Sequence, residues 1–189
     1  MPLVRVIVEE VTRVGGDGRD GDTSFERFCL DAHPRLVAAL AHHCGDVHLA
    51  EELAQEALIR AGDRWSKVGG MDSPLGWTYR VGANLAASSF RRRGAERRAL
   101  ERRSAGRTDR YTDPDGGDRV AVRDALAQLT DRQRQVVVMR YFLDLSVEQT
   151  GEVLGLRAGA VRMQSTRALV ALRQMLASGE RHEEVTDGG

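Results

Sequence analysis

The sequence predicts an all-α protein made of two small helical domains joined by a flexible linker. Only 5% of the 189 residues are aromatic although 41% are hydrophobic, so the cores must consist mainly of leucine, valine and alanine, which suits helices. Apolar residues recur at helical spacing along most of the chain, except in residues 104–119, which have almost no apolar content. We therefore expect the following division: a flexible arm (1–23), a first domain (24–103), a linker (104–119), a second domain (120–177) and an acidic flexible tail (178–189).

The first domain begins with a helix that we expect to start at Thr23. Thr23 and Glu26 have the spacing of a capping box, and apolar residues follow at helical intervals. Pro34 is expected to kink or divide this helix, because proline lacks the backbone N–H of a helix interior. A break follows at Gly45, and Asp46 is placed to cap the next helix.

The helix expected from Val47 to Trp65 has two different faces. One face carries an apolar stripe at four-residue intervals, which predicts a core contact. The opposite face is polar and acidic with an isoleucine in its middle, and its residues are Glu52, Gln55, Glu56, Ile59 and Asp63. One interpretation is a docking surface for a basic protein partner, and the other is a solvated helix face with a single exposed apolar residue.

Ser73 and Pro74 predict the start of the next helix, because a serine cap followed by proline is a preferred helix beginning. This helix continues into residues 91–103, which contain seven arginines. Aromatic, amide and arginine side chains gather on it, namely Trp77, Arg80, Asn84, Arg91 and Arg92. Such a combination binds single-stranded or melted DNA through stacking and phosphate contacts, although a core tryptophan beside a solvated helix end would give the same pattern.

Two further helices are expected between the linker and residue 146. The segment AVRDALAQL has helical spacing, and Thr130 with Gln133 forms a capping box ahead of Val136, Val137 and Met139.

Residues 146–172 have the pattern of a helix-turn-helix. Ser146 and Gln149 form a capping box, and Gly155 can take the left-handed conformation that ends a helix. The segment 157–173 that follows contains four arginines and no acidic residue. A helix of this kind can lie in the major groove of DNA with its arginines toward phosphates and bases. A surface helical hairpin with a basic face is the alternative.

Several other classes of protein are disfavoured. No apolar run approaches the roughly 18 residues that span a bilayer, and the first 23 residues lack the apolar centre of a signal peptide, so we expect no membrane insertion and a cytoplasmic location. Clustered carboxylates or a Ser/His or Cys/His set with convincing spacing are missing, so we expect no catalytic residues and no enzyme activity.

A zinc site is a further alternative that we disfavour. Cysteine and histidine occur close together in the first domain, at Cys29, His33, His42, His43 and Cys44. No CxxC or HxxxH pair frames them, and free cysteines are usually small core residues, so neither a metal nor a cofactor is expected.

The order of these motifs resembles the extracytoplasmic-function (ECF) sigma factors of bacteria, the smallest class of alternative sigma factor. The resemblance covers about residues 24–176 and rests on AEELAQEALIRA, PLGWTYRVGANLA, the arginine run, the linker, LTDRQRQVVVMRYFLDLS and GLRAGAVRMQSTRAL. It implies two domains, called region 2 and region 4, that bind core RNA polymerase and direct it to particular promoters. It also implies that the protein is associated with the nucleoid when bound to polymerase.

Motif by motif, the resemblance implies three sets of contact residues. The set for the clamp helices of the polymerase β′ subunit is Glu52, Gln55, Glu56 and Ile59. The set with which region 2 captures and melts the -10 promoter element is Val68, Trp77, Arg80, Asn84, Arg91 and Arg92. The set with which region 4 reads the -35 element is Arg157, Arg162, Met163, Gln164, Thr166 and Arg167. Further implied partners are the polymerase β flap and an anti-sigma factor.

The sequence departs from the family pattern at four places. Val68 stands where an aromatic residue is common, and Ser88 and Ser89 stand where an acidic or longer residue is common. Arg157 replaces a small hydroxyl residue, and Met163-Gln164 replaces a more polar, basic pair. A helix-turn-helix regulator that acts without polymerase is the alternative function. It would explain residues 120–176 but would leave the acidic face and the surroundings of Asn84 unexplained.

Overall fold

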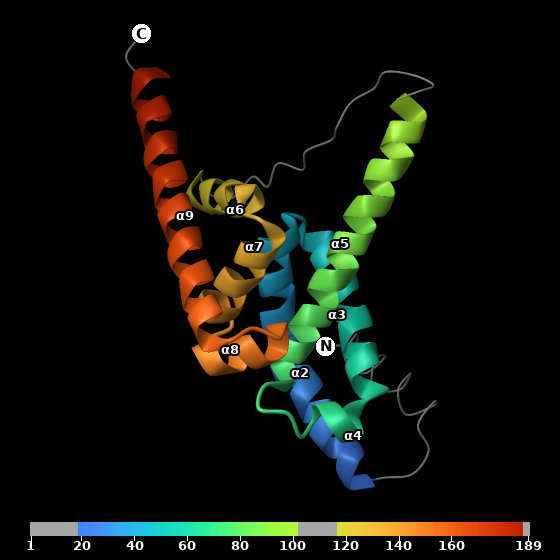
Figure 1. Ribbon diagram of the computed structural model, residues 1–189. Coiled ribbons are helices and arrows are strands. Elements are labelled where there is room, and N and C mark those ends of the chain that lie inside the picture. The colour runs from blue at the N-terminus through green and yellow to red at the C-terminus, as the bar shows by residue number, and fades with distance from the viewer. Residues whose placement is uncertain (1–18, 102–116, 187–189) are drawn as a thin grey trace.

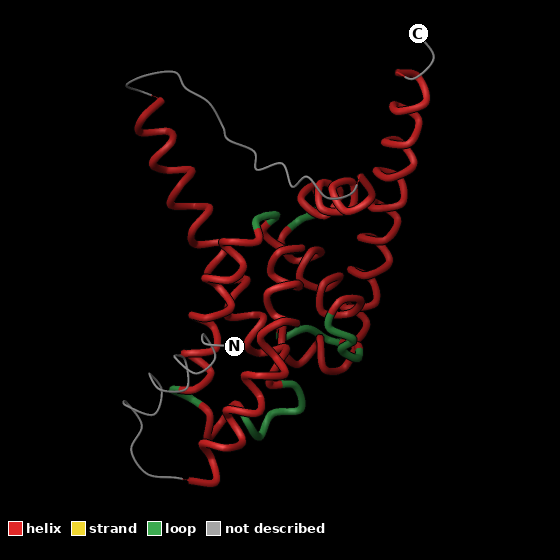
Figure 2. The backbone as a smooth tube through the Cα atoms, turned by 180° about the vertical axis from the view of Figure 1, so that it is seen from behind, coloured by secondary structure: helices red, strands yellow, loops and turns green. Residues whose placement is uncertain are grey.

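The computed structural model describes residues 19–101 and 117–186, with side chains for residues 24–91 and 121–177. Every regular element in these residues is a helix, as Figures 1 and 2 show, which confirms the all-α prediction. In chain order the elements are α2 (Arg19–Cys44), α3 (Val47–Gly62), α4 (Trp65–Val68), α5 (Pro74–Glu101), α6 (Gly117–Gln128), α7 (Asp131–Val137), the π-helix η1 (Val138–Phe142), α8 (Val147–Leu154) and α9 (Ala158–Thr186).

The first helical unit consists of α2, α3, α4 and α5. Asp46 caps α3 as predicted, since its carboxylate accepts a hydrogen bond of 3.0 Å from the backbone N–H of Leu49. Ser73 caps α5 in the same way, with 3.1 Å between its hydroxyl and the backbone nitrogen of Gly76. The helices enclose a core of leucine and alanine with one buried tyrosine, Tyr79.

The first helix differs from the prediction in two ways. α2 begins at Arg19, so Thr23 lies inside the helix and is not its cap. Pro34 also lies inside α2 and does not divide it. Phe25 and Cys29 before the proline and Leu36 after it are buried in one core, which stabilises both halves of the helix together.

The helix expected from Val47 to Trp65 is interrupted. α3 ends at Gly62 and the short α4 begins at Trp65. The interruption places the Trp65 indole against two aromatic rings of α2, with centroid distances of 5.1 Å to Phe25 and 4.9 Å to Phe28. Aromatic packing therefore redirects the chain here, which local propensity does not predict.

In the second unit both predicted capping boxes are confirmed. Thr130 and Gln133 exchange hydrogen bonds at the start of α7, and Ser146 and Gln149 do so at the start of α8. Gly155 ends α8 with a φ of 66°, which is the left-handed conformation predicted for it.

The helix-turn-helix requires a second glycine that the sequence pattern did not single out. A Cβ atom at Gly151 would lie 2.6 Å from the carbonyl oxygen of Leu156, which is backbone and cannot rotate away. We expect Gly151→Ala to lower the free energy of unfolding by about 1–3 kcal/mol, the range for overpacked sites. Gly159→Ala is the matched control, since a Cβ there meets nothing within 4 Å. Urea unfolding measures both, and equal stabilities of the two variants would contradict this packing.

The boundaries of the second unit differ from the predicted domain limits. α6 begins at Gly117, inside the segment expected to be a linker, and the rest of that segment lies outside the described residues. α9 continues to Thr186, so the tail expected to be flexible from Ser178 is helical over most of its length. The predicted arm also lies outside the described residues up to residue 18.

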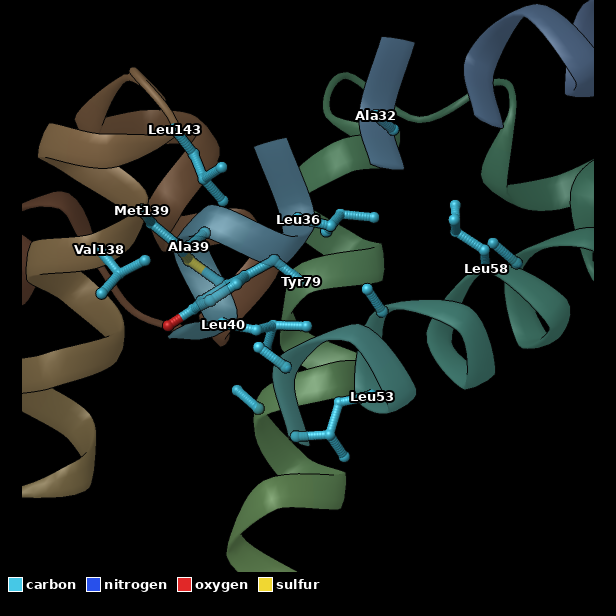
Figure 3. Close-up of a cluster of buried hydrophobic side chains, with 14 of the residues drawn as sticks. Ala32, Leu36, Ala39, Leu40, Leu53, Leu58, Tyr79, Val138, Met139 and Leu143 are labelled. Carbon is cyan, nitrogen blue, oxygen red and sulfur yellow. The ribbon is translucent and has the colours of Figure 1, made fainter. Parts of the chain in front are cut away.

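The two units share one hydrophobic core. Val138, Met139 and Leu143 of the second unit are almost completely buried and belong to the same cluster as Leu36 and Tyr79 of the first. Figure 3 shows these side chains side by side around the tyrosine ring. Residues that are far apart in the sequence therefore hold the two units together, and α5 and α9 extend from opposite sides of this centre (Figure 1).

Candidate nucleic-acid and protein interfaces

The first candidate surface is the acidic face of α3. Leu49, Leu53 and Ala57 are buried against α2 and α5, which turns the opposite side of the helix outward. Of the four predicted docking residues, Glu52 is exposed and the other three are half-buried, namely Gln55, Glu56 and Ile59.

Charge on this face is partly neutralised at one end. The Glu56 carboxylate accepts a hydrogen bond of 2.7 Å from the Arg60 guanidinium, one helical turn further on. Ile59 contacts the core with part of its side chain and offers the rest to the surface. An isoleucine framed by an amide and carboxylates suits a partner that has both apolar and basic side chains.

The second candidate surface is a stripe along α5. Trp77, Arg80, Asn84 and Arg91 follow one another at intervals of three, four and seven residues, so they lie along one side of the helix. Asn84 and Arg91 are exposed, whereas Trp77 and Arg80 are half-buried. The Arg91 guanidinium donates to the Ser88 hydroxyl at 3.0 Å.

Two residues predicted for this surface, Val68 and Arg92, are not seen on it. Val68 has no exposed surface and packs into the core at the end of α4. Its side chain cannot contact a base in this structure, so it supports the loop that follows it. Arg92 lies within α5, but its side chain is outside the described residues.

The third candidate surface is the first half of α9. Val161 and Ala168 are buried and anchor this helix against the rest of the second unit. The opposite side presents the predicted recognition residues: Arg157, Arg162, Met163, Thr166 and Arg167 are exposed, and Gln164 is half-buried. The structure therefore brings all six residues of this set together on one helix and the turn that precedes it.

The exposed arginines of this helix have few protein partners. Arg162 lies 3.5 Å from the Glu148 carboxylate of α8, and both side chains are more than 60% exposed. An exposed pair of this kind contributes little stability, about 0–1 kcal/mol. Arg162 is therefore available to a phosphate or a base.

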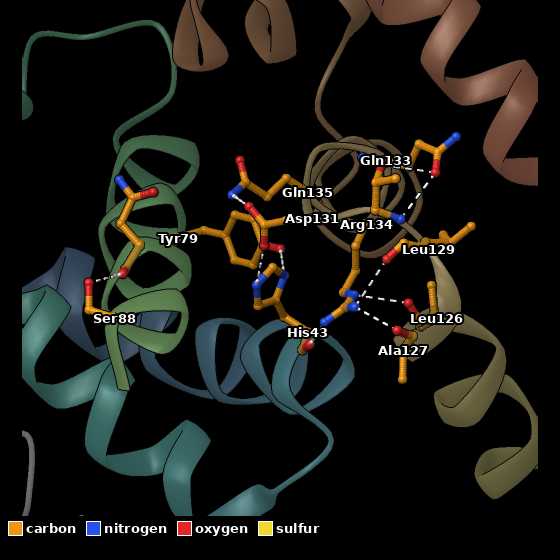
Figure 4. Close-up of polar contacts among 12 residues, drawn as sticks. His43, Tyr79, Ser88, Leu126, Ala127, Leu129, Asp131, Gln133, Arg134 and Gln135 are labelled. Atoms are coloured by element: carbon orange, nitrogen blue, oxygen red, sulfur yellow. Dashed lines mark hydrogen bonds and ion pairs between the residues drawn. The ribbon is translucent and has the colours of Figure 1, made fainter. Parts of the chain in front are cut away.

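Sequence reasoning missed a polar network that joins the two units (Figure 4). His43 of α2 is buried, with its Nδ1 3.1 Å from the Tyr79 hydroxyl and its Nε2 3.4 Å from the Asp131 carboxylate. Arg134 of α7 donates to the His43 carbonyl oxygen at 2.9 Å. Each residue looked like an ordinary helix residue in the sequence, and no local pattern pairs α2 with α7.

Hydrogen bonding and burial shift the pKa values of two groups in this network. The hydrogen bond from His43 lowers the pKa of Asp131, with a smaller contribution from the charges of Arg134 and Arg132. Burial raises the pKa of Tyr79 well above its usual value, and the negative charge of Asp131 adds to this. The phenol therefore remains neutral and hydrogen-bonded.

The two cysteines are protected in the folded chain. Burial raises the pKa of Cys29 to about 12, and burial also raises the pKa of Cys44, whose thiol donates to the Asp46 carbonyl oxygen at 3.2 Å. At pH 8 we expect Cys29 to react with a disulfide reagent at least about a hundred times more slowly in the native chain than in urea, because the thiolate is the reactive form. Labelling followed by mass spectrometry measures this, and equal rates would contradict the burial.

Metal sites and membrane-spanning helices are both absent from the part of the chain that the structure describes. No cluster of three or more histidine, cysteine, aspartate or glutamate side chains there is placed to hold a metal ion. None of the described helices has the length and apolarity needed to cross a membrane.

Comparison with known proteins assigns both units. Residues 30–96 match the Sigma-70 region 2 family, and residues 125–174 match the Sigma-70 region 4 family. The chain is 31% identical over 177 residues to the ECF RNA polymerase sigma factor SigL of Mycobacterium tuberculosis, covering 88% of this chain and 96% of that protein. The chain belongs to the ECF sigma factors. This sigma factor is also 30% identical to the RNA polymerase sigma-E factor of Streptomyces avermitilis, over 82% of its own length and 86% of the relative's.

Solved structures support the fold of this sigma factor. The sigma factor RpoE of Bartonella quintana, solved in complex with the anti-sigma factor NepR, superposes with a TM-score of 0.63 at 22% identity, covering 81% of this chain and 96% of that one. CnrH, solved with the cytosolic domain of CnrY, superposes with a TM-score of 0.59 at 20% identity, covering 93% and 98%. The first and second units described above are thus region 2 and region 4 of an alternative sigma factor, an initiation factor that works with RNA polymerase on promoter DNA.

Proposed function

We propose that the acidic face of α3 docks this sigma factor on the clamp helices of the polymerase β′ subunit. Support comes from the position of Glu52, Gln55 and Glu56 on the outer side of α3, with Ile59 beside them as an apolar contact. Charged residues at such a rim steer association with a basic partner, and the apolar residue adds affinity once water is excluded.

Region 2 captures and melts the -10 element with the stripe on α5. Asn84 offers an amide that can hydrogen-bond the edge of an unpaired base, and Arg91 offers a guanidinium to the phosphates. Trp77 lies about two turns before Asn84 and exposes part of its indole for stacking, with Arg80 between them. Val68 supports the loop between α4 and α5, and Arg92 adds a further positive charge to the sequence of α5.

Region 4 reads the -35 element with α9. Arg162 and Arg167 are five residues apart and exposed, so they can reach a base edge and a phosphate from the same groove. Met163 and Thr166 lie between them and suit contacts to thymine methyl groups, while Gln164 and Arg157 flank them.

The remaining proposals concern the bounds of the two regions, further partners and the place of action. We assign residues 24–103 to region 2 and 120–177 to region 4, with region 4 also contacting the polymerase β flap. The RpoE structure was solved in complex with an anti-sigma factor, and this supports an anti-sigma partner for the present protein. Its place of action is the cytoplasm, at the nucleoid while it is bound to polymerase.

A single observation carries the proposal: three surfaces with different chemistry lie on three separate helices, α3, α5 and α9. A helix-turn-helix regulator acting alone needs only the third. Permanganate, which oxidises unpaired thymines, separates the two functions on a promoter fragment that this protein activates. We expect reactive thymines around the -10 element only when the protein and core polymerase are both present. Protection of duplex DNA by the protein alone, with no reactive thymines when polymerase is added, would favour the regulator.

A further inference from the structure

We propose that a groove between α2, α3 and α6 binds a free long-chain carboxylate, with the carboxylate on Arg123 and the hydrocarbon chain along α2. The volume of the groove is about 530 Å³, which lies within the range of about 300–1,000 Å³ that is usual for small-molecule sites. None of the residues that line it belongs to the three surfaces of the proposed function, so the inference does not depend on them.

The floor of the groove is aliphatic. α2 contributes apolar side chains at helical spacing along one side, and Val47 at the start of α3 lies beside them. The contributing residues of α2 are Pro34, Val37, Ala38 and Ala41. Pro34, Ala38 and Val47 are exposed, so the stripe is open to a ligand. No phenylalanine, tyrosine or tryptophan among the described residues lines the groove, which favours a saturated chain over an aromatic ring.

The length of the groove sets the length of the ligand. His33 lines one end, and Gly45, which directly follows the last residue of α2, lines the other. The part of α2 from His33 to Cys44 spans about 16 Å at a rise of about 1.5 Å per residue. An extended hydrocarbon chain advances about 1.3 Å per carbon, because a C–C bond is about 1.5 Å long and the chain is staggered. A chain of about twelve carbons therefore matches the groove.

Arg123 of α6 supplies a cation at the Gly45 end. A Cβ atom at Gly45 would lie 3.6 Å from Cδ of Arg123, so the arginine stem passes directly over this glycine. The Arg123 side chain is only 20% exposed. Among the described side chains, the one carboxylate within 4 Å of it belongs to Asp124, at 3.9 Å and itself 69% exposed.

This distance is too long for a hydrogen bond, so Asp124 leaves the guanidinium without a close acceptor. A cation that is largely withdrawn from water is normally paired and hydrogen-bonded. A ligand carboxylate can satisfy this requirement, because its two oxygens match the fork of guanidinium N–H groups. The unmet pairing of Arg123 is the observation that points to an anionic head group.

His33 and Glu51 determine the orientation of the ligand. Burial lowers the pKa of His33, and the negative charge of Glu51 partly opposes this, so the two groups act on each other in the same half of the groove. His33 is therefore largely neutral at pH 7. The Glu51 carboxylate is exposed and would repel a ligand carboxylate beside it. The charges thus favour one orientation, with the carboxylate at Arg123 and the hydrocarbon end toward His33.

Titration of the full chain with dodecanoate, below its micelle concentration, tests the inference by isothermal calorimetry. We expect one molecule to bind per chain. Octanoate is expected to bind at least about tenfold more weakly, because each buried methylene strengthens binding up to about fourfold. Dodecylammonium has the same chain with the opposite charge and is also expected to bind at least about tenfold more weakly. Equal binding of the two dodecyl probes, or no binding of dodecanoate, would overturn the inference.

Removal of the cation tests the head-group contact. We expect Arg123→Gln to weaken dodecanoate binding at least about tenfold, because a hydrogen bond to a charged group is lost. Arg27→Gln removes the same charge from an exposed position of α2 outside the groove and is the matched control, expected to bind within about twofold of the wild type. Circular dichroism checks that both variants are folded, and the comparison of probes on the wild-type chain needs no variant. Equal losses in both variants would contradict the site.

A bulky side chain tests the position of the hydrocarbon chain. We expect Ala38→Phe to fill the floor and weaken dodecanoate binding at least about tenfold, whereas Ser66→Phe, at an exposed position of α4, should leave it within about twofold. Equal affinities of these two variants would show that the probe binds elsewhere. Deletion of residues 2–18 is expected to change the affinity less than about twofold. A gain of more than about tenfold would assign the groove to that segment of the chain and overturn the inference.

Discussion

Glu52→Arg combined with Gln55→Ala is expected to lower promoter-specific transcription at least about a hundredfold while the protein stays folded. Glu52 is exposed on the outer face of α3, so its replacement removes no core contact. The new cation would face the basic surface that we propose on the polymerase clamp, and like charges in an interface cost several kcal/mol, where each 1.4 kcal/mol is about tenfold. The measurement is run-off transcription with purified core polymerase, together with circular dichroism to show that the helices persist.

A matched control separates docking from net charge. Asp124→Arg reverses an exposed carboxylate on α6 and changes the net charge by the same amount as Glu52→Arg. We expect this variant to transcribe within about twofold of the wild type, since exposed charges away from an interface have small effects. Equal losses in both variants would show that total charge matters and the α3 face does not.

Arg162→Ala and Arg167→Ala are expected to weaken recognition of the -35 element about five- to 150-fold each. Both side chains are exposed on α9, and an arginine contact to a base or phosphate is worth about 1–3 kcal/mol. If the replaced arginine reads a base, the variant will lose discrimination between bases at one position of the element. If it binds a phosphate, the variant will bind all sequences more weakly by the same factor, and the salt dependence of binding will be reduced. Transcription from promoters with single -35 substitutions, at two salt concentrations, distinguishes these roles.

Arg173→Ala is the control for this pair. Arg173 is exposed on the same helix but lies farther from its start, so the charge change is the same and the contact with the groove is weaker. If Arg173→Ala weakens recognition of the -35 element as much as Arg162→Ala does, α9 attracts DNA by its charge alone and does not read its sequence.

Local signals in the sequence predicted the ends of several helices correctly. The capping boxes at Thr130 and Ser146 form as expected, and Gly155 has the left-handed conformation. These features depend on residues three or four positions apart, so the sequence contains all the information that determines them. The same reasoning failed at Thr23, because a capping motif is only a local preference and the helix extends past it.

Contacts between distant segments could not be predicted in this way. α3 ends at Gly62 and α4 begins at Trp65, whose indole packs on Phe25 and Phe28 of α2, helix residues that are distant in the sequence. Arg134 and His43 belong to separate predicted domains, and nothing near either residue indicates that they meet. Arg80 illustrates the consequence for function, because its motif indicates DNA binding while its contact in the structure is with α8.

The sequence predicted which helices carry the candidate surfaces more accurately than it predicted whether each residue on them is exposed. The recognition residues of α9 lie together because a helix fixes the relation between neighbouring turns. Val68 was expected at the DNA surface and is buried, since its exposure depends on how α4 packs against α2 and α3.

Run-off transcription from a library of genomic promoter fragments tests the central claim most directly. The reactions contain purified core polymerase with or without this protein. We expect transcripts that depend on the protein, and alignment of their start sites will give two shared elements near -10 and -35. The contradicting result is that no transcript depends on the protein, while the protein alone protects a defined duplex.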